Sequence, residues 1–318
     1  MKPDVLIIHP PRAPHMQVLE QRYTLHRYDL ADAAGQAALL TGPGQRCEAV
    51  VTNGHHPLTR AMIAQLPALK VVACASAGYE MIDHEALTER GVVLTTTSDA
   101  LFDDVADTAL LLTMAARRSL VAAHAYVVSG DWGRKGMFPL QTSLRGKKLG
   151  IVGMGRIGQA MIARAQAVGL ETAYFSRTAK TGTGLPFQPD LLALATWADI
   201  LVVIVAGGAG TRNLIDDRIL RALGPQGTLV NVSRGSVVDE AALIAALRDG
   251  GLGSAGLDVF WNEPTPDPAL TALPNVTLYP HHASGTVETR EAMAQLVVDN
   301  LAAHFAGQPL LTPVNLPV

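Results

Sequence analysis

Short apolar runs that alternate with helical patterns restrict the fold of this chain more than any other feature. The runs VLIIH (5–9), CEAVVT (47–52), LKVVACA (69–75) and VVLT (92–95) are separated by amphipathic stretches. Such runs form strands that are covered on both faces, and helical crossovers between them make the strands parallel. The N-terminal part is therefore predicted to be a parallel α/β domain.

A second series of apolar runs follows a long helical pattern. That pattern begins at Asp103 and stops at Gly130, and residues 131–147 then lack an apolar period, which is typical of a connection between domains or subunits. The second series starts with KKLGIVGMGRIG and continues with the strands ETAYF, DILVVIVA, GTLVNV, GSAGLDVF and VTLYP. A last helix is predicted over 287–307, and we expect it to return to the first domain. Because 318 residues exceed what one core usually supports, the sequence predicts two α/β domains.

Composition argues against several classes of function. The net charge is −3 and 48% of the residues are hydrophobic, so the chain offers no general attraction for nucleic acid or an anionic membrane. The longest apolar runs, such as Ile200–Ala206, are far shorter than the roughly 20 residues of a membrane helix. Cys47 and Cys74 lie in apolar segments without metal-ligand spacing, so we expect buried, reduced thiols and no metal site. The start, MKPDVLIIHPP, is typical of a first strand rather than a secretion signal, and a cytoplasmic protein is expected.

Three glycines between an apolar strand and a helix indicate a nucleotide-binding turn. Gly153, Gly155 and Gly158 fit the pattern G-x-G-x-x-G. The first glycine permits the tight turn, the second lets the backbone approach a pyrophosphate, and the third allows helix and strand to pack closely. The helix N-terminus adds N–H groups and the positive end of its dipole. The residues expected to contact the cofactor here are Gly153, Met154, Gly155, Arg156, Ile157 and Gly158.

The end of the next strand bears on the choice of cofactor. NAD enzymes usually carry an acidic residue about 20 positions beyond the turn, where it binds the ribose hydroxyls. No Asp or Glu occurs between Glu171 and Asp190, and ETAYF is instead followed by Ser176, Arg177 and Thr178. Two hydroxyls and a guanidinium can bind the additional phosphate of NADP. The sequence favours NADPH over NADH, while a solvated Arg177 with NAD bound without a ribose carboxylate stays open as the alternative.

Three polar residues follow apolar strands of the second series, at the edge where parallel sheets bind ligands. Arg234 follows GTLVNVS, Glu263 follows GLDVFWN, and His281 follows VTLYP. Reduction of a 2-oxo acid requires a cation that binds the carboxylate and polarises the carbonyl, an acid that protonates the oxygen, and a carboxylate that keeps this acid charged. Arg, His and Glu supply these functions, because a neighbouring Glu stabilises the imidazolium form of histidine.

These motifs together resemble one enzyme family. NVSRGSVVDEAAL, AGLDVFWNEP, PHHASGT and GMGRIG resemble the motifs of the D-2-hydroxyacid dehydrogenases, and more narrowly those of their glyoxylate, hydroxypyruvate and hydroxyphenylpyruvate reductases. The resemblance covers nearly the whole chain. It implies a flavodoxin-like substrate domain (1–100 plus 287–318), a Rossmann cofactor domain (101–286), a cleft between these doubly wound domains, and a homodimer.

The resemblance also implies roles for individual residues. Arg234 would bind the substrate carboxylate and carbonyl, and His281 would be the general acid. Glu263 would keep that acid charged, and Asp258 would contact the nicotinamide carboxamide. In the first domain, CASAGYEMID resembles the turn whose backbone N–H groups bind the substrate carboxylate. The expected contacts are Ala77, Gly78, Arg234, His281 and Ser284 for the substrate, and Ala206, Val232 and the 176–178 segment in addition to the turn for the cofactor.

Some positions leave alternatives open. Where the family commonly has a loop rich in Pro and Thr, this chain reads VIVAGGAGTRN, so Ala206 and Gly207 are less clearly indicated as cofactor contacts. His282, beside His281, is expected to pack or to hydrogen-bond rather than to transfer a proton. Four large side chains could line a pocket for a bulky substrate or reach a neighbouring subunit, although packing or dimer contacts are favoured; they are Trp132, Met137, Phe138 and Trp261.

The sequence thus favours an NADPH-preferring reductase that converts glyoxylate, hydroxypyruvate or hydroxyphenylpyruvate to the D-2-hydroxy acid. An NAD-dependent dehydrogenase of another hydroxy acid is the alternative within the family. A dinucleotide-sensing, corepressor-like binding protein is the alternative of another class. The presence of all three catalytic residue types favours the enzyme.

Overall fold

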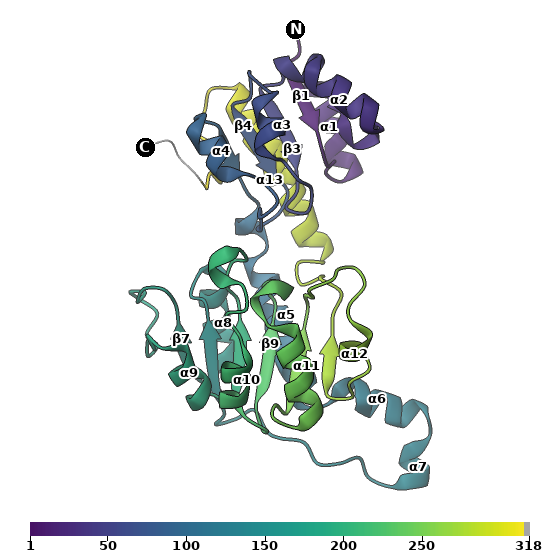
Figure 1. Cartoon of the computed structure of the whole chain (residues 1–318), viewed down its shortest axis with the longest axis vertical. Coiled ribbons are helices and arrows are strands. Elements are labelled where there is room, and N and C mark those ends of the chain that lie inside the picture. Colours follow the sequence, from purple (N-terminus) through teal and green to yellow (C-terminus); the bar gives the residue numbers. More distant parts are fainter. Residues whose placement is uncertain (315–318) are drawn as a thin grey trace. The chain divides into compact units, whose positions relative to one another are not determined.

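Two separate parallel sheets hold the strands of the computed structural model, which describes residues 1–314 (Figure 1). The five-stranded sheet belongs to unit 1, a compact unit that consists of Met1–Leu101 and the segment starting at Gly285. The six-stranded sheet belongs to unit 2, Phe102–Ser284. The prediction of two parallel α/β domains is therefore confirmed.

The sheet of unit 1 has the strand order β2-β1-β3-β4-β5. In β1, Val5 and Ile7 face a core shared with helices α1 and α13. Leu6, and Ile8 directly after the strand, face a core shared with α2, α3 and α4. Alternate side chains of a strand point to opposite faces, so one apolar run fills both cores. The strands are β1 (Asp4–Ile7), β2 (Thr24–Arg27), β3 (Ala49–Thr52), β4 (Val71–Cys74) and β5 (Val93–Thr95). The α-helices are α1 (Ala13–Arg22), α2 (Ala33–Thr41), α3 (Arg60–Ala64), α4 (His84–Glu89) and α13 (Val287–Phe305), and the 3-10 helices are η1 (Tyr28–Leu30), η2 (Pro43–Arg46) and η3 (Ser98–Ala100).

One strand of unit 1, β2, is not predicted by the sequence pattern. It lies at the edge of the sheet, where it pairs with β1, and none of its residues is fully buried. An edge strand with polar side chains lacks the apolar run that reveals a buried strand.

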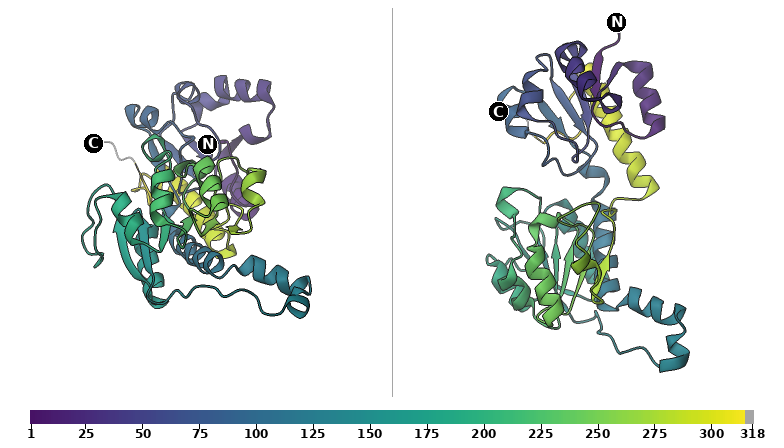
Figure 2. Two further views of the ribbon diagram at one scale, coloured as in Figure 1. Left: turned by 60° about the horizontal axis from the view of Figure 1, so that its bottom comes forward. Right: turned by 45° about the vertical axis from the view of Figure 1, so that its right-hand side comes forward.

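The sheet of unit 2 has the order β11-β10-β9-β8-β6-β7. Helices α5 and α8 pack together on one face, and α9, α10 and α11 cover the large core on the other (Figures 1 and 2). The strands are β6 (Lys148–Val152), β7 (Glu171–Phe175), β8 (Ile200–Val203), β9 (Thr228–Asn231), β10 (Ser254–Leu257) and β11 (Val276–Leu278). The α-helices are α5 (Phe102–Arg117), α6 (Leu120–Val128), α7 (Asp131–Lys135), α8 (Arg156–Ala167), α9 (Leu191–Trp197), α10 (Asp217–Leu223), α11 (Glu240–Asp249) and α12 (Pro268–Thr271), and the 3-10 helices are η4 (Ala209–Thr211) and η5 (Gly235–Val237).

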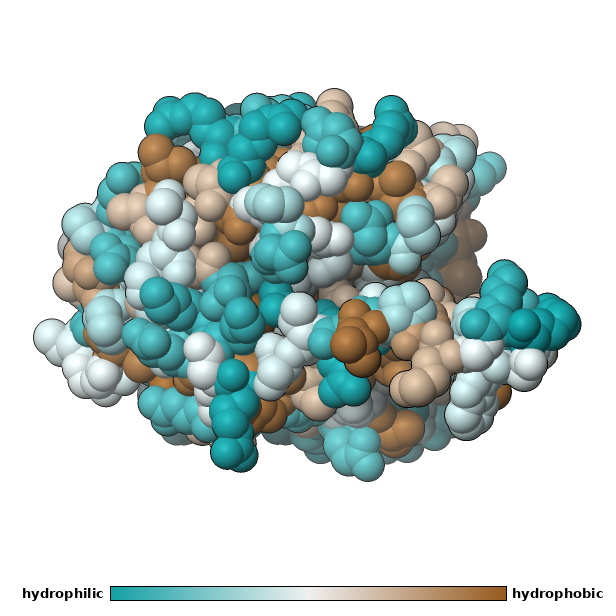
Figure 3. Space-filling model, turned by 90° about the horizontal axis from the view of Figure 1, so that it is seen from below, coloured by the Kyte–Doolittle hydropathy of each residue, from teal (hydrophilic) through white to brown (hydrophobic). Residues whose placement is uncertain are grey.

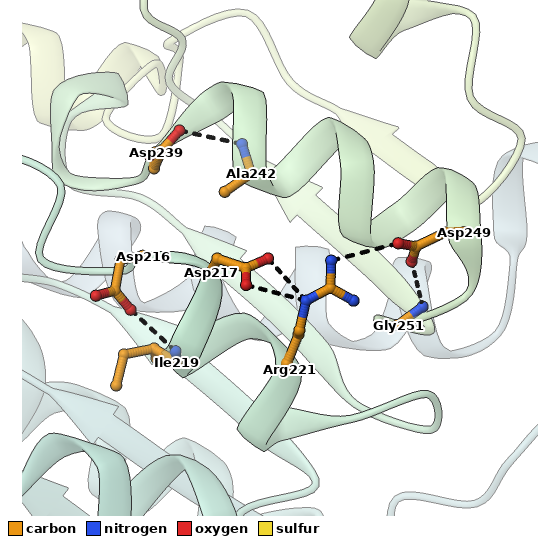
Figure 4. Close-up of polar contacts among 8 residues, drawn as sticks. All are labelled: Asp216, Asp217, Ile219, Arg221, Asp239, Ala242, Asp249 and Gly251. Carbon is orange, nitrogen blue, oxygen red and sulfur yellow. Dashed lines mark hydrogen bonds and ion pairs between the residues drawn. The ribbon is translucent and has the colours of Figure 1, made fainter.

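Acidic residues cap helices α10 and α11 (Figure 4). Asp216 accepts a hydrogen bond from the backbone N–H of Ile219 at 3.0 Å, at the start of α10. Asp239 plays the same part for Ala242 at the start of α11. Such caps satisfy N–H groups that have no partner within the helix, so the sequence fixes where each helix begins.

The helix predicted from Asp103 to Gly130 is instead two helices. Helix α5 ends at Arg117, and α6 begins at Leu120 after Ser119, which has a left-handed backbone with φ of +47°. A left-handed residue cannot continue a right-handed helix, and neither Gly nor Pro marks this break in the sequence. The short helix α7 then lies in the segment that was predicted to be a connection.

Helices α6 and α7 project from the body of unit 2 in all views of Figures 1 and 2. Large hydrophobic side chains on this projection are exposed, among them Val128, Trp132, Met137 and Leu140. On the face drawn in Figure 3, hydrophobic residues stand among hydrophilic ones. Among the helices of residues 1–314, none is both long enough and apolar enough to cross a membrane.

Candidate active site

The carboxyl edge of the unit 2 sheet brings together the residues that the sequence singled out in that part of the chain. The strand order reverses at β6, which lies between β7 and β8. Open parallel sheets bind ligands outside the carboxyl ends of their strands, at such a reversal. The glycine turn follows β6, Ser176 follows β7, Arg234 follows β9, Asp258 and Glu263 follow β10, and His281 follows β11.

The glycine turn has the geometry that a dinucleotide requires. Gly153 has φ of +106°, and a Cβ at Gly158 would lie 2.2 Å from the carbonyl oxygen of Gly153. Helix α8 therefore approaches the turn too closely for any side chain at Gly158. A Cβ at Gly155 would meet no heavy atom within 4 Å, and no side chain caps the first turn of α8. The open space at Gly155 beside a helix N-terminus fits a pyrophosphate. Of the intervening residues, Met154 is buried, Ile157 is half-buried and Arg156 is exposed.

The end of β7 lies directly beside this turn. The N–H of Gly153 donates a hydrogen bond to the carbonyl of Phe175 at 2.8 Å, so the next residues emerge at the same edge. The Ser176 hydroxyl donates to the carbonyl oxygen of Thr178 at 2.6 Å, and both Arg177 and Thr178 are exposed. The strand end presents a guanidinium where an NAD enzyme usually presents a carboxylate.

Glu263 and His281 form a hydrogen-bonded pair. Their Oε2 and Nδ1 atoms lie 2.6 Å apart, and the other Glu263 oxygen, Oε1, accepts from the backbone N–H of Phe260 at 2.9 Å. When Glu263 is ionised, its Oε2 accepts the hydrogen bond and Nδ1 of His281 donates it. The side chains are 28% and 30% exposed for His281 and Glu263, so the pair remains accessible from solvent.

Asp258 holds the backbone that carries His281. Its Oδ1 accepts from the N–H of His282 at 2.7 Å and its Oδ2 from the N–H of Ala283 at 3.2 Å, while its carbonyl accepts from the N–H of His281 at 2.7 Å. Burial raises the pKa of Asp258, and the hydrogen bond from His282 acts in the opposite direction. His281 has φ of +49°, a left-handed conformation that is unfavourable for histidine, and these bonds help to hold it.

Arg234 lies on a loop that packs against the loop of Glu263. Its Nη1 donates to the carbonyl of Ser233 at 2.7 Å, and its own carbonyl accepts from the side-chain amide of Asn231 at 2.9 Å. A Cβ at the next residue, Gly235, would lie 2.0 Å from the carbonyl group of Phe260. Only glycine permits this approach, so the Arg234 and Glu263 loops are in direct backbone contact.

Comparison with known proteins agrees with this geometry. Residues 110–283 match the family described as D-isomer specific 2-hydroxyacid dehydrogenase, NAD binding domain. The chain is 44% identical to the 2-ketogluconate reductase of Gluconobacter oxydans (strain 621H), over 98% of this chain and 99% of that protein. This chain belongs to the D-isomer specific 2-hydroxyacid dehydrogenase family.

It is also 44% identical to the hydroxyphenylpyruvate reductase of Plectranthus scutellarioides, over 94% of each protein. A crystal structure of the NADPH-dependent glyoxylate/hydroxypyruvate reductase from Sinorhizobium meliloti, in complex with NADP and malonate, has a TM-score of 0.91 and 41% identity, covering 100% of this chain and 98% of that one.

Membership in the D-2-hydroxyacid dehydrogenases confirms the resemblance read from the motifs. The chain is an oxidoreductase with an NAD(P)-binding domain. Within residues 1–314, no three His, Cys, Asp or Glu side chains are grouped so that they could hold a metal ion. Cys47 and Cys74 are free and buried, and burial raises the pKa of each thiol to about 12.

Two further residues that the sequence predicted to contact the cofactor follow neighbouring strands. Val232 is buried just after β9, where its N–H donates to the carbonyl of Val203 at 3.2 Å. Ala206 is exposed after β8, and its carbonyl accepts from the hydroxyl of Thr211 at 2.8 Å. This hydrogen bond orders the loop that departs from the family pattern. Gly207 is half-buried in the same loop.

The substrate positions expected in unit 1 lie at the carboxyl edge of that sheet. Ala77 and Gly78 follow β4, and within residues 1–314 their N–H groups donate to no backbone carbonyl. Such N–H groups are suited to bind a carboxylate. A Cβ at Gly54, which follows β3, would lie 1.9 Å from the carbonyl oxygen of Gly78, so the two turns are in contact.

A pair of histidines beside this turn was missed by the sequence reasoning. The rings of His9 and His56 have centroids 4.7 Å apart, and the side-chain oxygen of Asn53 lies 2.7 Å from Nδ1 of His56. His9 follows β1 and His56 follows β3, where the strand order of unit 1 reverses. Burial lowers the pKa of His9, and the charge of His56 lowers it further. The position of both residues just after apolar strands was the signal that could have revealed them.

The remaining expected residues are distributed over unit 2. Ser284 is half-buried directly after Ala283. Trp132, Met137 and Phe138 belong to the projecting segment, and the ring of Phe138 packs against Tyr126 with centroids 5.3 Å apart. His282 is exposed, with its ring 6.2 Å from that of Tyr279. Trp261 is half-buried, and its indole N–H donates to the carbonyl of Val238 at 2.7 Å.

Proposed function

We propose that this chain reduces small 2-oxo acids to D-2-hydroxy acids, with NADPH as the preferred reductant. Glyoxylate, hydroxypyruvate and hydroxyphenylpyruvate are the substrates that we expect. The observation that carries the proposal is the 2.6 Å contact between Glu263 and His281, at the same sheet edge as the glycine turn. Family membership supports it, as do the three relatives named above, each of which is named as a reductase of a 2-oxo acid.

The chain's own side chains would perform the proton transfer. NADPH, when bound, supplies a hydride to the carbonyl carbon of the substrate. The electron pair of the carbonyl π bond passes to the oxygen, which takes a proton from His281. Because Nδ1 faces Glu263, the proton would come from Nε2. Glu263 stays ionised throughout and stabilises the imidazolium form of His281 before the transfer. One proton and one hydride are consumed for each hydroxy acid formed.

Two sets of donors would hold the substrate. The guanidinium of Arg234 is suited to bind the carboxylate and to polarise the carbonyl, since its planar donors match two oxygens. The N–H groups of Ala77 and Gly78, in unit 1, are also suited to bind a carboxylate by backbone hydrogen bonds. On this proposal unit 1 is the substrate domain and unit 2 is the cofactor domain.

Arg177 supports the preference for NADPH. It is exposed at the end of β7, beside two hydroxyl residues and the glycine turn. A charge-assisted hydrogen bond to a phosphate is worth about 1.5–3 kcal/mol, which corresponds to roughly a 10- to 100-fold preference.

We propose in addition that the chain forms a homodimer through the segment that projects from unit 2. Trp132 is 62% exposed and Leu140 is 95% exposed, and a partner subunit would cover such side chains. Sedimentation equilibrium distinguishes a dimer from a monomer.

A single assay tests the proposed function. Wild-type protein is incubated with a panel of 2-oxo acids, first with NADPH and then with NADH, and nucleotide oxidation is followed by absorbance. We expect turnover of glyoxylate and hydroxypyruvate, with kcat/KM about tenfold or more higher for NADPH. The Arg177→Gln variant should lose most of the preference while its NADH activity is retained.

The outcomes also separate the rival functions. Turnover with NADH alone would favour an NAD-dependent dehydrogenase and refute the role given to Arg177. Tight nucleotide binding without turnover of any 2-oxo acid would favour a dinucleotide-sensing binding protein and refute the reductase.

A further inference from the structure

We propose that Trp261 is a positioning residue that fixes the Glu263 carboxylate against His281. The proposal rests on the proposed function, because it concerns the proton donor of that reaction. It adds a residue that acts through Glu263 rather than on the substrate.

Trp261 is held by three other segments of unit 2. Its indole N–H donates to the carbonyl of Val238 at 2.7 Å, after η5. Its backbone N–H donates to Oε2 of Glu240 at 3.3 Å, at the start of α11. The guanidinium of Arg212, from the loop after β8, stands 4.5 Å from the centre of the ring, which is a cation–π contact. Because two contacts hold the side chain and a third holds the backbone N–H, the position of the Trp261 backbone is fixed as well.

The backbone that Trp261 fixes is the one that orients Glu263. Phe260 directly precedes Trp261, and its backbone N–H donates to Oε1 of Glu263 at 2.9 Å. The other oxygen of Glu263 then faces His281 at 2.6 Å. The Glu263 carboxylate is thus held between the backbone N–H of Phe260 and the imidazole of His281. Rotation of this backbone would displace the donor and, with it, the carboxylate.

The same backbone also supports the loop of Arg234. The contact of Gly235 with the carbonyl of Phe260 leaves no room for a Cβ. Two backbone hydrogen bonds join the loop of Arg212 to the loop of Arg234. The N–H of Asn213 donates to the carbonyl of Ser236 at 2.9 Å, and the N–H of Ile215 donates to that of Val237 at 3.0 Å. Trp261 therefore stands where the loops of Arg212, Arg234 and Glu263 meet. A tryptophan that only filled space there would need neither the indole donor nor the cation.

The test begins with Trp261→Phe, which retains an aromatic ring but removes the indole N–H. We expect kcat for reduction to fall about tenfold, because displacement of a catalytic group by a fraction of an ångström is costly, while the Kd for NADPH stays within about twofold. The matched control is Trp197→Phe. Trp197 ends α9 and has the ammonium of Lys148 at 5.5 Å from its ring, at the amino edge of the same sheet. That variant should keep wild-type kcat.

A double-mutant cycle shows whether Trp261 acts through Glu263. In a Glu263→Gln background the carboxylate charge is already gone, so adding Trp261→Phe should change kcat by less than about twofold. If the two losses multiply instead, Trp261 acts independently of Glu263 and the proposal is wrong.

A readout without turnover keeps the inference separate from the proposed function. The imidazole of His281 is titrated by NMR in the wild type, in Trp261→Phe and in Trp197→Phe. We expect the His281 midpoint to move to lower pH in Trp261→Phe alone, because a displaced carboxylate stabilises the imidazolium less. An unchanged midpoint overturns the inference even if the wild type is an active reductase, and a shifted midpoint supports it even if no 2-oxo acid is turned over. If Trp261→Phe does not fold, Trp261→Tyr, which also keeps an aromatic ring but lacks the indole N–H, is titrated in its place and should shift the midpoint in the same direction.

Discussion

The carboxyl edges of the two sheets differ in chemistry although their strands follow the same order. In both units the second strand lies outside the first, and the order reverses beside the first strand. In unit 1 this edge carries backbone N–H groups at Ala77 and Gly78 and the pair of His9 and His56, whose rings are in contact. In unit 2 it carries a glycine turn and the hydrogen-bonded pair of Glu263 and His281.

This difference shows what the fold supplies and what the side chains supply. A parallel sheet provides an edge where strand ends and helix N-termini meet, which suits anion binding in either unit. Proton transfer needs more, namely an acid and a charge that keeps it protonated, and only the loops of Glu263 and His281 bring such a pair together among the residues singled out here. The edge of unit 1 is therefore suited to binding, and the edge of unit 2 to chemistry.

Replacement of His281, the proposed proton donor, should have the largest effect on turnover. His281→Asn keeps a residue that tolerates the left-handed backbone, but it removes the imidazole. We expect kcat to fall by about 10²- to 10⁴-fold, the range typical of a general acid, with nucleotide affinity retained. Steady-state kinetics and fluorescence titration with NADPH measure the two quantities.

His282→Leu is the matched control for that variant. The His282 ring is exposed, and its backbone N–H, which Asp258 accepts, is preserved by the substitution. We expect kcat within about threefold of the wild type, as for surface substitutions in general. Loss of turnover in His282→Leu, with His281→Asn active, would reverse the assignment of the two histidines.

Two glycines of the turn allow the affinity for NADPH and the stability of unit 2 to be tested separately. Gly155→Ala places a methyl group in open space, so the unfolding free energy should change by no more than about 0.5 kcal/mol. The methyl group would occupy the space of the pyrophosphate, so the Kd for NADPH should rise at least about tenfold.

Gly158→Ala, unlike Gly155→Ala, should lower the unfolding free energy. Its Cβ would lie 2.2 Å from the carbonyl oxygen of Gly153, so α8 must move and stability should fall by about 1–3 kcal/mol. Urea denaturation and NADPH titration of both variants test this contrast. Equal stability of the two variants would show that the close packing at Gly158 is not needed.

Periodic and local signals in the sequence predicted much of the fold and the site. Buried strands such as Ile200–Val203 are continuous apolar runs, and the glycine turn has a fixed spacing, so both are visible without tertiary information. Glu263 and His281 follow separate strands, and the topology of a parallel sheet was enough to expect them at one edge.

Features that depend on contacts between distant segments were not predictable. The polar edge strand β2 is defined by its pairing with β1, and the break at Ser119 carries no Gly or Pro. The left-handed backbone of His281 depends on the carboxylate of Asp258, which is recruited from another strand end.

Asp258 makes a smaller, pH-dependent contribution to the unfolding free energy. Burial raises its pKa above the ordinary value of 3.8, so the folded state holds this proton more tightly than the unfolded state. The stability from this group is fully present below pH 3.8 and is lost as the pH rises through the folded-state pKa. Asp258→Asn keeps an oxygen for the N–H of His282 but cannot ionise. The unfolding free energy of the wild type minus that of the variant should therefore decrease as the pH is raised from about 4 to about 7. Denaturation curves at several pH values measure this difference, and an increase would contradict the burial of Asp258.

The smallest expected effect concerns the binding edge of unit 1. If Ala77 and Gly78 hold the carboxylate of a 2-oxo acid, the rest of the substrate extends along an edge where Gly54 contacts Gly78 and His56 follows. His56 can hydrogen-bond the hydroxyl of hydroxypyruvate, which glyoxylate lacks. Loss of one such bond costs about 0.5–1.5 kcal/mol, so His56→Leu should lower kcat/KM for hydroxypyruvate about 2- to 12-fold and leave glyoxylate nearly unchanged. The exposed neighbour His55, replaced by Leu, is the control. Equal losses for the two substrates would mean that His56 does not contact the substrate's side chain, and the histidine pair would then have to be regarded as part of the packing of unit 1 rather than of its binding edge.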